Sequence, residues 1–270
     1  MQPTLRGGLC YNTANIKNKG IVLMIHVYGI EHILYLLFSI CLVVGVTLFA
    51  KRKIKTEKGL QLLIRLCGLV LFAMILYNRL SICVNSQYWY APENGVFGRF
   101  QLILPNSFCG MTSLCLSLAV MFGRRDNIAL HALTYLGLLG GLLTLAYPDF
   151  IGQDPSFFYS CTISGLLHHT MAVVLSVLLL STGYVRPDFK KWYALPICFC
   201  IYITYGLFLV RVLSYGDAFY IYTEILDGTS LNWWTMAVIL FPVHLLWLFI
   251  YTKLTTHKGV RRNVRKSHSA

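Results

Sequence analysis

Charged residues are scarce in this 270-residue sequence, where they make up 12% of the chain while hydrophobic residues make up 57%. Soluble domains carry about 25% charged residues, and a soluble core of this size could not bury so much apolar surface. Among the charged residues the acidic ones are the fewer, with 10 Asp and Glu against 23 Lys and Arg. The composition therefore excludes an ordinary soluble domain and predicts a membrane protein.

Several functional signatures are also missing. The nine cysteines form no CxxC pair, so the sequence shows neither zinc-site spacing nor a disulfide framework. No Walker motif, CxxCH haem motif or Rossmann glycine fingerprint is present. We therefore expect no metal and no cofactor. The disulfide state of Cys83 and Cys161, which both fall near predicted outer helix ends, stays open at this stage.

Seven apolar segments can be distinguished. A helix of about 20 residues crosses a hydrocarbon core of about 30 Å. The segments cover residues 29–50, 59–83, 99–122, 128–147, 159–185, 192–213 and 233–252. Short connections leave no room for a soluble domain. The sequence predicts an all-α, polytopic seven-transmembrane-helix bundle over residues 29–252, followed by a basic tail over residues 253–270.

The loops between these segments alternate in charge. Basic residues gather in 51–58, 123–127, 186–191 and the tail, whereas "YPDFIGQDPSF" and "SYGDAFYIYTEILDGTSLNW" contain no Lys or Arg. Cytoplasmic loops are enriched in Lys and Arg, so we expect the N-terminus outside and the C-terminus inside. Because the positive charges flank apolar runs, they indicate membrane orientation rather than nucleic-acid binding. The tail is interpreted as a topology anchor, with a patch for anionic lipid head groups as the alternative.

The first 28 residues fit this orientation poorly. They place Arg6, Lys17 and Lys19 on the expected outer side and contain no signal-peptide pattern. We treat residues 1–28 as an N-terminal extension, with Met24 as an alternative start.

Polar residues inside the predicted spans form the candidate site. His168 and His169 lie nine and ten residues into their span, which at 1.5 Å per residue places them about 15 Å deep. Cys109 and His244 fall at a similar depth. Intramembrane ionisable residues usually face the bundle interior and indicate function. Hydrogen bonding between helices is the alternative, and we favour it for His244.

Buried cysteines usually pack as small hydrophobes, so the surroundings of Cys109 decide whether its thiol is reactive. A thiol becomes a nucleophile when a neighbouring histidine takes its proton. Pro105 is expected to kink the span, and Asn106 and Ser107 to satisfy the freed backbone groups. Gly137 and Gly141, at GxxxG spacing, are interpreted as helix packing.

A second polar layer lies nearer the expected outer face and includes His32, Arg79 and Arg211. We interpret it as a cationic rim for phosphate or carboxylate head groups. Interfacial snorkelling is the alternative.

Short motifs support these assignments: "HILYLLF" (32–38), "LPNSFCGM" (104–111), "YPDF" (147–150) and "HHTMAVVLSVLLL" (168–180). In these motifs the chain resembles the YwaF-like integral membrane protein family, which is related to transmembrane protein 164 of animals. The resemblance implies a seven-helix domain and, for animal members, acyl transfer to lysophospholipids by a membrane-embedded Cys and His. By motif position, Cys109 corresponds to the Cys of the family's LPxxxC motif, and His169 to the single His that many bacterial members keep before the apolar run. His32 corresponds to the His that opens the first helix, whereas Ser107 stands where many bacterial members carry His or Gln.

The leading interpretation is a membrane-embedded lipid acyltransferase or acyl hydrolase. Cys109 would be the nucleophile, His169 the general base and acid, and His168 its support. The residues expected to bind substrate are Asn106, Ser107, His32, Arg79, Arg211 and His244. Membrane lipids are the expected partners. Two alternatives from other classes are a small-molecule or proton-coupled transporter, with the histidines as a relay, and a non-catalytic membrane sensor or assembly partner.

Overall fold

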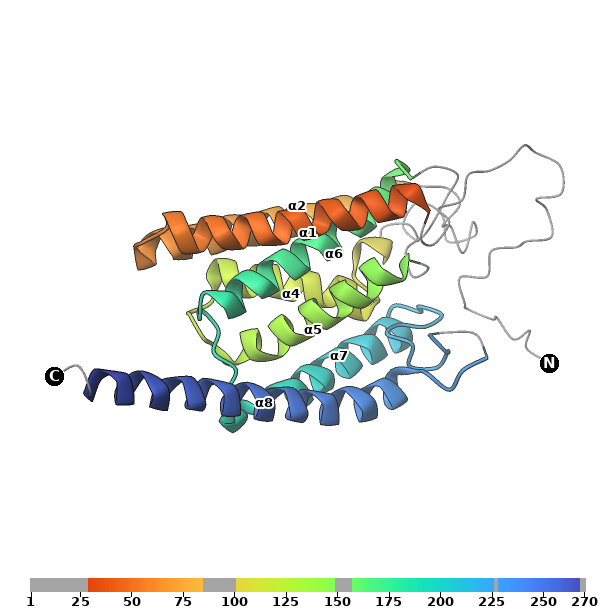
Figure 1. The fold of residues 1–270 in the computed structure, drawn as a ribbon. Helices are drawn as coiled ribbons and strands as arrows, with labels where there is room; N and C mark the ends of the chain where they lie inside the picture. The colour runs from red at the N-terminus through yellow and green to blue at the C-terminus, as the bar shows by residue number, and fades with distance from the viewer. Residues whose placement is uncertain (1–28, 85–100, 149–156, 226–227, 268–270) are drawn as a thin grey trace, which may run out of the picture.

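A computed structural model describes residues 29–84, 101–148, 157–225 and 228–267 of the chain (Figure 1). Within these ranges the chain forms helices and no strand, which confirms the predicted all-α class. The predicted extension, residues 1–28, lies outside the described residues. The elements are α1 (Ile30–Lys53), α2 (Glu57–Val84), η4 (Gln101–Ile103), α4 (Phe108–Phe122), α5 (Ile128–Ala146), α6 (Ser160–Ser181), η6 (Phe189–Lys191), α7 (Ala194–Arg211) and α8 (Trp233–Ser267).

Six helical segments in the described part are long and apolar enough to cross a membrane. They are α1, α2, α5, α6, the segment Phe189–Arg211 that contains α7, and the first part of α8. The predicted spans 29–50, 59–83, 128–147, 159–185, 192–213 and 233–252 correspond to them within a few residues. α8 continues as a helix through Ser267, beyond the expected end of the last span.

The third predicted span, 99–122, is not one long helix, and the expectation of a kink at Pro105 within it was wrong. α4 has 15 residues, which at 1.5 Å per residue gives a length of about 22 Å, short of the hydrocarbon core. Pro105 precedes the helix, because proline lacks an N–H and disfavours helical geometry in the residue before it. Ser107 then caps α4, since its Oγ accepts a hydrogen bond from Gly110 N at 3.3 Å.

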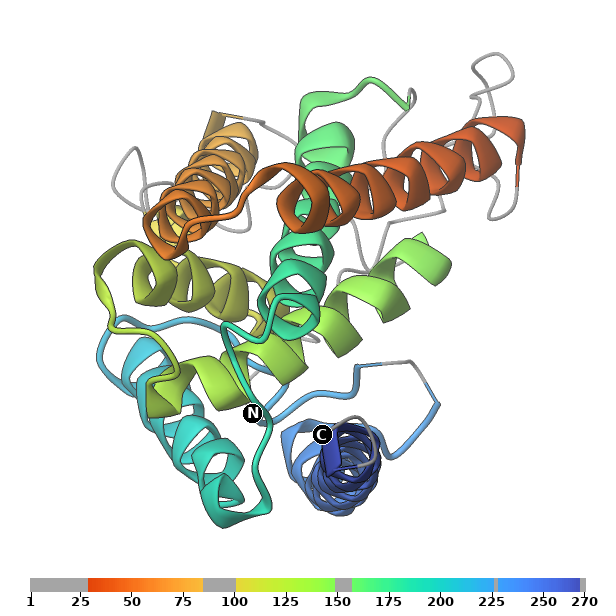
Figure 2. The same cartoon turned by 60° about the vertical axis from the view of Figure 1, so that its left-hand side comes forward.

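α6 occupies the centre of the bundle, and α1, α2, α4 and α5 pack around it (Figures 1 and 2). Of its apolar span, 72% is buried, whereas α1 and α8 bury 17% of theirs at the periphery. Polar side chains join the helices: Tyr35 Oη lies 2.8 Å from Thr170 Oγ1, and Asn78 donates to Ser164 Oγ at 3.1 Å. Such bonds hold helices together where lipid provides no hydrophobic driving force. The central position of α6 places its two histidines inside the protein.

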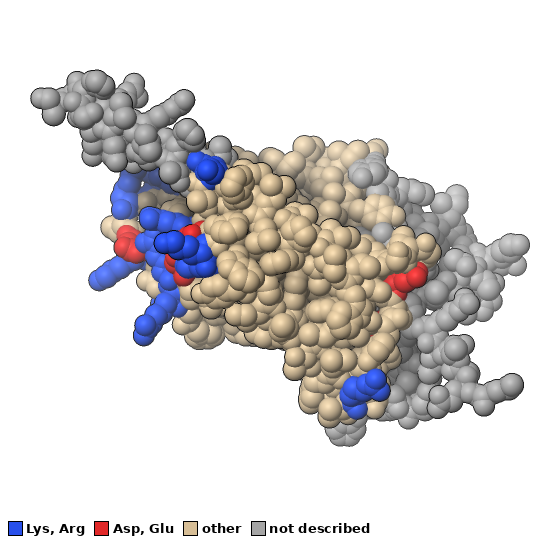
Figure 3. Space-filling view, turned by 90° about the horizontal axis from the view of Figure 1, so that it is seen from below, with Lys and Arg blue, Asp and Glu red and all other residues tan. Residues whose placement is uncertain are grey.

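Basic side chains gather at one end of the molecule (Figure 3). We call this the basic end. It comprises the turns between α1 and α2, between α4 and α5, and between α6 and α7. Its Lys and Arg residues are Lys51, Arg52, Lys53, Lys55, Lys58, Arg124, Arg125, Arg186, Lys190 and Lys191. The charge alternation of the loops therefore appears as a spatial separation, and the orientation in the membrane stays a prediction.

Candidate functional site

Cys109 and His169 line the same small cavity between α4, α5 and α6. The cavity has a volume of about 10 Å³, close to the smallest that holds one water molecule. Its wall consists of Cys109, Thr112, Ser113, Leu136, Gly137, Gly140, Gly141, His169 and Ala172. The cavity therefore has room for one water but not for an acyl chain.

Cys109 is the second residue of α4, not a residue midway along a long span. Its Sγ lies 4.0 Å from Thr144 Oγ1 on α5. Gly140 faces the sulfur closely, because a Cβ built there would lie 3.4 Å from Sγ. In the part of the chain that the structure describes, Cys109 makes no hydrogen bond to a histidine. The thiol and the imidazole of His169 therefore share the cavity wall without a direct hydrogen bond.

The first turn of α4 offers hydrogen-bond donors. The first amides of any helix have no partner within that helix. Here Gly110 N bonds to Ser107 Oγ and Met111 N bonds to Ser107 O. The amides of Phe108 and Cys109 have no acceptor among the described residues. These two donors, at the positive end of the helix dipole, are placed to attract negative charge beside the thiol.

The two adjacent histidines face different partners. His169 lines the cavity, whereas His168 Nδ1 lies 3.2 Å from Ser113 Oγ on α4. Their ring centroids are 4.1 Å apart, and both side chains are buried. Neighbouring helix positions point in different directions, so only one of the pair reaches the cavity. Ser113 thus fixes the ring of His168, which in turn packs against the ring of His169.

Close packing of α5 against α6 shapes the cavity. A Cβ at Gly141 would lie 2.6 Å from Val173 Cγ2 and 3.0 Å from His169 O, so only glycine permits this approach. The packing role predicted for Gly137 and Gly141 is confirmed. Their place in the cavity wall was missed, as were Thr144 and Ser113. Glycines at GxxxG spacing beside a polar pair on another helix were the available signal.

Arg79 of α2 lies against the start of α4. Its Nη1 donates to Asn106 Oδ1 at 3.3 Å, and its buried Nε has no partner in the described structure. A Cβ at Gly110 would lie 2.8 Å from Arg79 Nη2. A cation at a helix N-terminus is unfavourable by itself. The guanidinium and the helix end together therefore favour an anion between or beside them.

The connection between α7 and α8 reaches the same place. Phe219 N donates to Asn106 O at 2.8 Å, and the ring of Phe219 packs edge-on against Phe108, with centroids 5.5 Å apart. Phe219 is buried and has a φ of 57°. The non-helical approach to Cys109 is thus held by an element distant in sequence.

Three predicted site residues lie away from Cys109 and its neighbours. His32 is buried and donates from Nε2 to Leu145 O at 2.7 Å, which ties α1 to α5. Arg211 is exposed, and its Nη2 donates to Tyr222 Oη at 3.3 Å. His244 is buried against Tyr135, with ring centroids 4.7 Å apart. Ser107 acts as the N-cap of α4 and does not line the cavity either. The predicted set therefore divides into a group around Cys109 and three separate positions.

No group of three or more His, Cys, Asp or Glu side chains in the described residues could hold a metal ion. Cys83 and Cys161 are not joined in a disulfide. Around Cys109 the described residues supply a thiol, imidazoles, hydroxyls and backbone amides.

The family model of TMEM164 proteins matches residues 27–254, which include α1 to α7, the first part of α8, and both Cys109 and His169. No curated protein and no solved structure matches the chain. The predicted relation to transmembrane protein 164 is confirmed. Together with six membrane-length apolar helices, the match identifies a multi-pass integral membrane protein. The chain belongs to the TMEM164 family.

Proposed function

We propose that the protein transfers or hydrolyses lipid acyl groups through a covalent intermediate on Cys109. The observation that carries this proposal is the cavity shared by the Cys109 thiol and the His169 imidazole. A general base acts across a direct hydrogen bond or through one water. The cavity has room for one water, which supports proton transfer between these two groups.

In the first half-reaction, His169 takes the thiol proton and the Cys109 thiolate attacks the ester carbonyl carbon of a phospholipid. The tetrahedral intermediate collapses as the C–O bond to the glycerol oxygen breaks. His169 returns the proton to that oxygen, so a lysophospholipid leaves and an acyl thioester remains on Cys109. His168, held by Ser113, positions the ring of His169 through the contact between their two rings.

The developing oxyanion needs hydrogen-bond donors. The amides of Phe108 and Cys109, without acceptors among the described residues, are the best candidates. Removal of one such donor typically costs about 10²- to 10³-fold in rate. The Asn106 side chain is already engaged by Arg79, which makes it a weaker candidate for this role.

In the second half-reaction, a lysophospholipid hydroxyl or a water attacks the thioester carbonyl while His169 takes its proton. The new ester or free acid leaves, and the proton returns to the Cys109 sulfur. Arg79, whose Nε is unpaired and which lies at the positive end of α4, is suited to the phosphate of the lipid. The cavity must widen for an acyl ester to reach Sγ, because its volume matches a single water.

The test compares four forms of the purified full-length protein: wild type, Cys109→Ala, His169→Gln and the control Cys115→Ala. Cys115 also lies on α4 and is partly buried, but it does not line the cavity. Exchange of labelled acyl chains between a defined phospholipid and a lysophospholipid is measured in detergent micelles. Cys109→Ala should abolish exchange, and His169→Gln should lower it by about 10²- to 10⁴-fold.

The Cys115→Ala control should stay within about twofold of wild type, since it touches neither the cavity nor its histidines. A labelled acyl group released from wild type by neutral hydroxylamine, and absent from Cys109→Ala, would identify the thioester. Equal lipid turnover in all four forms would reject the mechanism.

A second candidate function is proton-coupled transport, and one observation favours it. Both ring nitrogens of His244 and the hydroxyl of Tyr135 are buried without a partner in the described structure. Intramembrane polar groups of this kind often form relays. Proton uptake into proteoliposomes that is lost in His244→Ala, with no acyl exchange in wild type, would favour transport over acyl transfer.

A further inference from the structure

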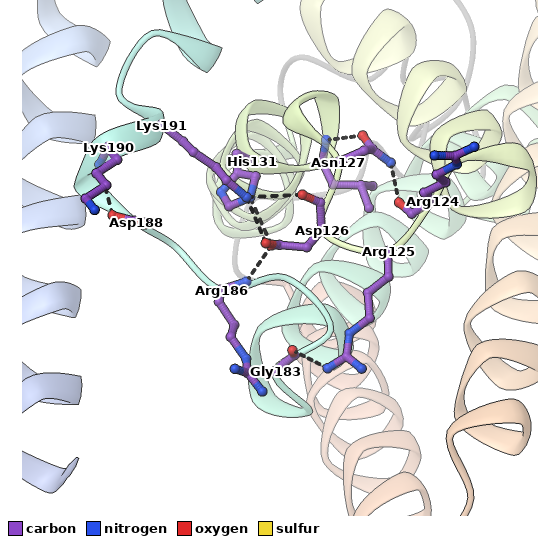
Figure 4. Close-up of polar contacts among 11 residues, drawn as sticks. Arg124, Arg125, Asp126, Asn127, His131, Gly183, Arg186, Asp188, Lys190 and Lys191 are labelled. Atoms are coloured by element: carbon purple, nitrogen blue, oxygen red, sulfur yellow. Dashed lines mark hydrogen bonds and ion pairs between the residues drawn. The ribbon is translucent and has the colours of Figure 1, made fainter.

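A second cavity lies at the basic end, beyond the C-terminus of α4. Its volume is about 280 Å³, and it is lined by Arg125, Asp126, Gly183, Tyr184 and Arg186. These residues come from the turn between α4 and α5 and from the turn between α6 and α7 (Figure 4). α4 runs the whole way from the Cys109 cavity to this one, so the two cavities are separate.

Gly183 allows the chain to form this wall. Its φ is +69°, a left-handed conformation that glycine adopts at little cost. The turn is closed by a hydrogen bond from Val185 N to Leu179 O at 3.1 Å, as is usual at helix C-termini. The turn directs Tyr184 into the core, where it is 3% exposed, and leaves Arg186 exposed.

The one carboxylate in the wall is already engaged. Asp126 accepts from Lys191 Nζ at 2.7 Å and from the backbone N of Arg186 at 3.1 Å, and it lies 2.9 Å from His131 Nε2. Figure 4 shows the Asp126 carboxylate directed toward Lys191 and His131, while the Arg186 side chain extends the other way. Asp126 therefore does not neutralise the guanidinium of Arg186.

Arg125 is a fixed cation on the opposite side of Gly183. Its Nη1 donates to Glu57 Oε1 at 2.6 Å and its Nη2 donates to Gly183 O at 2.9 Å. Its guanidinium also lies over the ring of Tyr184, 5.6 Å from the centroid. Arg125 is therefore held in one orientation beside the cavity.

Two groups in the wall have unused hydrogen-bonding capacity. The guanidinium of Arg186 forms no ion pair among the described residues, and a Cβ at Gly183 would lie 3.7 Å from its Nε. The hydroxyl of Tyr184 is buried and also lacks a partner in that part of the chain. Of the two groups only the Tyr184 hydroxyl is buried, and a buried polar group without a partner calls for an explanation such as an absent ligand.

We propose that this cavity binds a phosphate group, with Arg186 as its principal ligand and the guanidinium of Arg125, which is paired with Glu57, as a fixed second donor. A guanidinium binds the oxygens of phosphate in a bidentate manner. The neighbouring side chains of Arg124 and Lys190 also lack an anionic partner among the described residues, so the surroundings are positive. Basic pockets between membrane helices at the cytoplasmic side are typical sites for phospholipid head groups. The phosphate could equally come from a soluble ion. The proposal is independent of acyl transfer.

The test uses the purified full-length protein in a neutral detergent at constant ionic strength. Short-chain phosphatidic acid, diacylglycerol with the same chains, and inorganic phosphate are titrated against wild type, Arg186→Gln and Lys190→Gln. The two variants remove the same charge four residues apart, but only Arg186 lines the cavity. Phosphatidic acid should bind wild type saturably and Arg186→Gln about tenfold more weakly, because a charge-assisted bidentate bond is lost.

The Lys190→Gln control should change the affinity by less than about twofold, as expected for an exposed charge outside the site. Competition by inorganic phosphate would identify a soluble phosphate as the ligand source, and its absence would identify a lipid head group. Arg186→Lys keeps the charge but loses the planar fork, and should lie between wild type and Arg186→Gln. Diacylglycerol binding as tightly as phosphatidic acid, equal losses in Arg186→Gln and Lys190→Gln, or no saturable binding would each overturn the proposal.

Discussion

A single carboxylate, Asp126, joins two turns of the basic end. Partial burial alone would raise its pKa, but hydrogen bonds from Lys191 Nζ and Arg186 N, with the charges of His131 and Lys191, hold the pKa below its usual value of 3.8. Its φ of 55° is unusual for a residue other than glycine and costs roughly 1 kcal/mol. The lowered pKa means that the ionised carboxylate stabilises the folded state.

The sign of the pH effect follows from the lowered pKa. Asp126 contributes stability above its ordinary pKa of 3.8, and that contribution is lost as the pH falls through 3.8 and below. We expect Asp126→Asn to lower the melting temperature at pH 7, by an amount corresponding to about 1 kcal/mol or less because the side chain is 37% exposed. The difference from wild type should shrink toward pH 3.

Thermal unfolding in detergent between pH 7 and pH 3 measures this difference. Asp188→Asn is the control, because it lies in the same turn region and makes none of the Asp126 contacts. A gap between wild type and Asp126→Asn that stays constant over this range would contradict the assignment.

The sequence predicted some residues of the Cys109 group better than others. Depth along the spans placed Cys109 and the His168–His169 pair at one level, and the cavity contains Cys109 and His169. Depth could not separate His244 or His32 from that group, because it carries no information on which helices touch. Thr144 and Ser113 were missed for the same reason, since hydroxyls are common in membrane helices and point toward a site only once the packing is known.

At the scale of helices, contact between α5 and α6 depends on Gly141. A methyl group there would lie 2.6 Å from Val173 Cγ2 and 3.0 Å from His169 O, and a backbone oxygen cannot rotate away. We expect Gly141→Ala to destabilise the protein by about 1–3 kcal/mol, as overpacked cores do. Because His169 lies at the contact, the same substitution should also lower any activity of the Cys109 site.

Gly45 provides the matched control for this substitution. It also lies within an apolar helix, α1, but a Cβ there would have no atom within 4 Å. Alanine has a higher helix propensity than glycine, so Gly45→Ala should be neutral or stabilising by up to about 1 kcal/mol. Thermal unfolding of both variants in the same detergent compares them. Equal melting temperatures for Gly141→Ala and Gly45→Ala would show that the helix contact is looser than described.

Helix boundaries were predictable where hydrophobicity alone decides them. Six spans have the expected positions because long apolar runs between basic or polar turns leave few alternatives. α4 is shorter than the predicted span because hydropathy does not decide where it begins. Pro105 prevents the helix from starting earlier, and Ser107 supplies the N-cap. The motif that was expected to bend a helix instead begins one.

At the scale of the whole molecule, the separation of charge predicts an orientation. The basic end should face the cytoplasm, with the connection between α7 and α8 on the other side. An epitope tag at the C-terminus should resist added protease in sealed, right-side-out vesicles until detergent is added. A tag inserted after Thr229 should be cleaved in intact vesicles. The reverse pattern, or equal protection of both tags, would disprove this orientation.

The hydrogen bond from Phe219 to Asn106 O gives the protein a mechanical link between distant parts. Asn106 is three residues before Cys109, and no helical turn lies between them to absorb a displacement. Any partner, ligand or substitution that shifts Phe219 will therefore tilt the start of α4 and move the sulfur relative to His169. A change in the connection between α7 and α8 is thus expected to move the thiol through the backbone, without altering any side chain that lines its cavity.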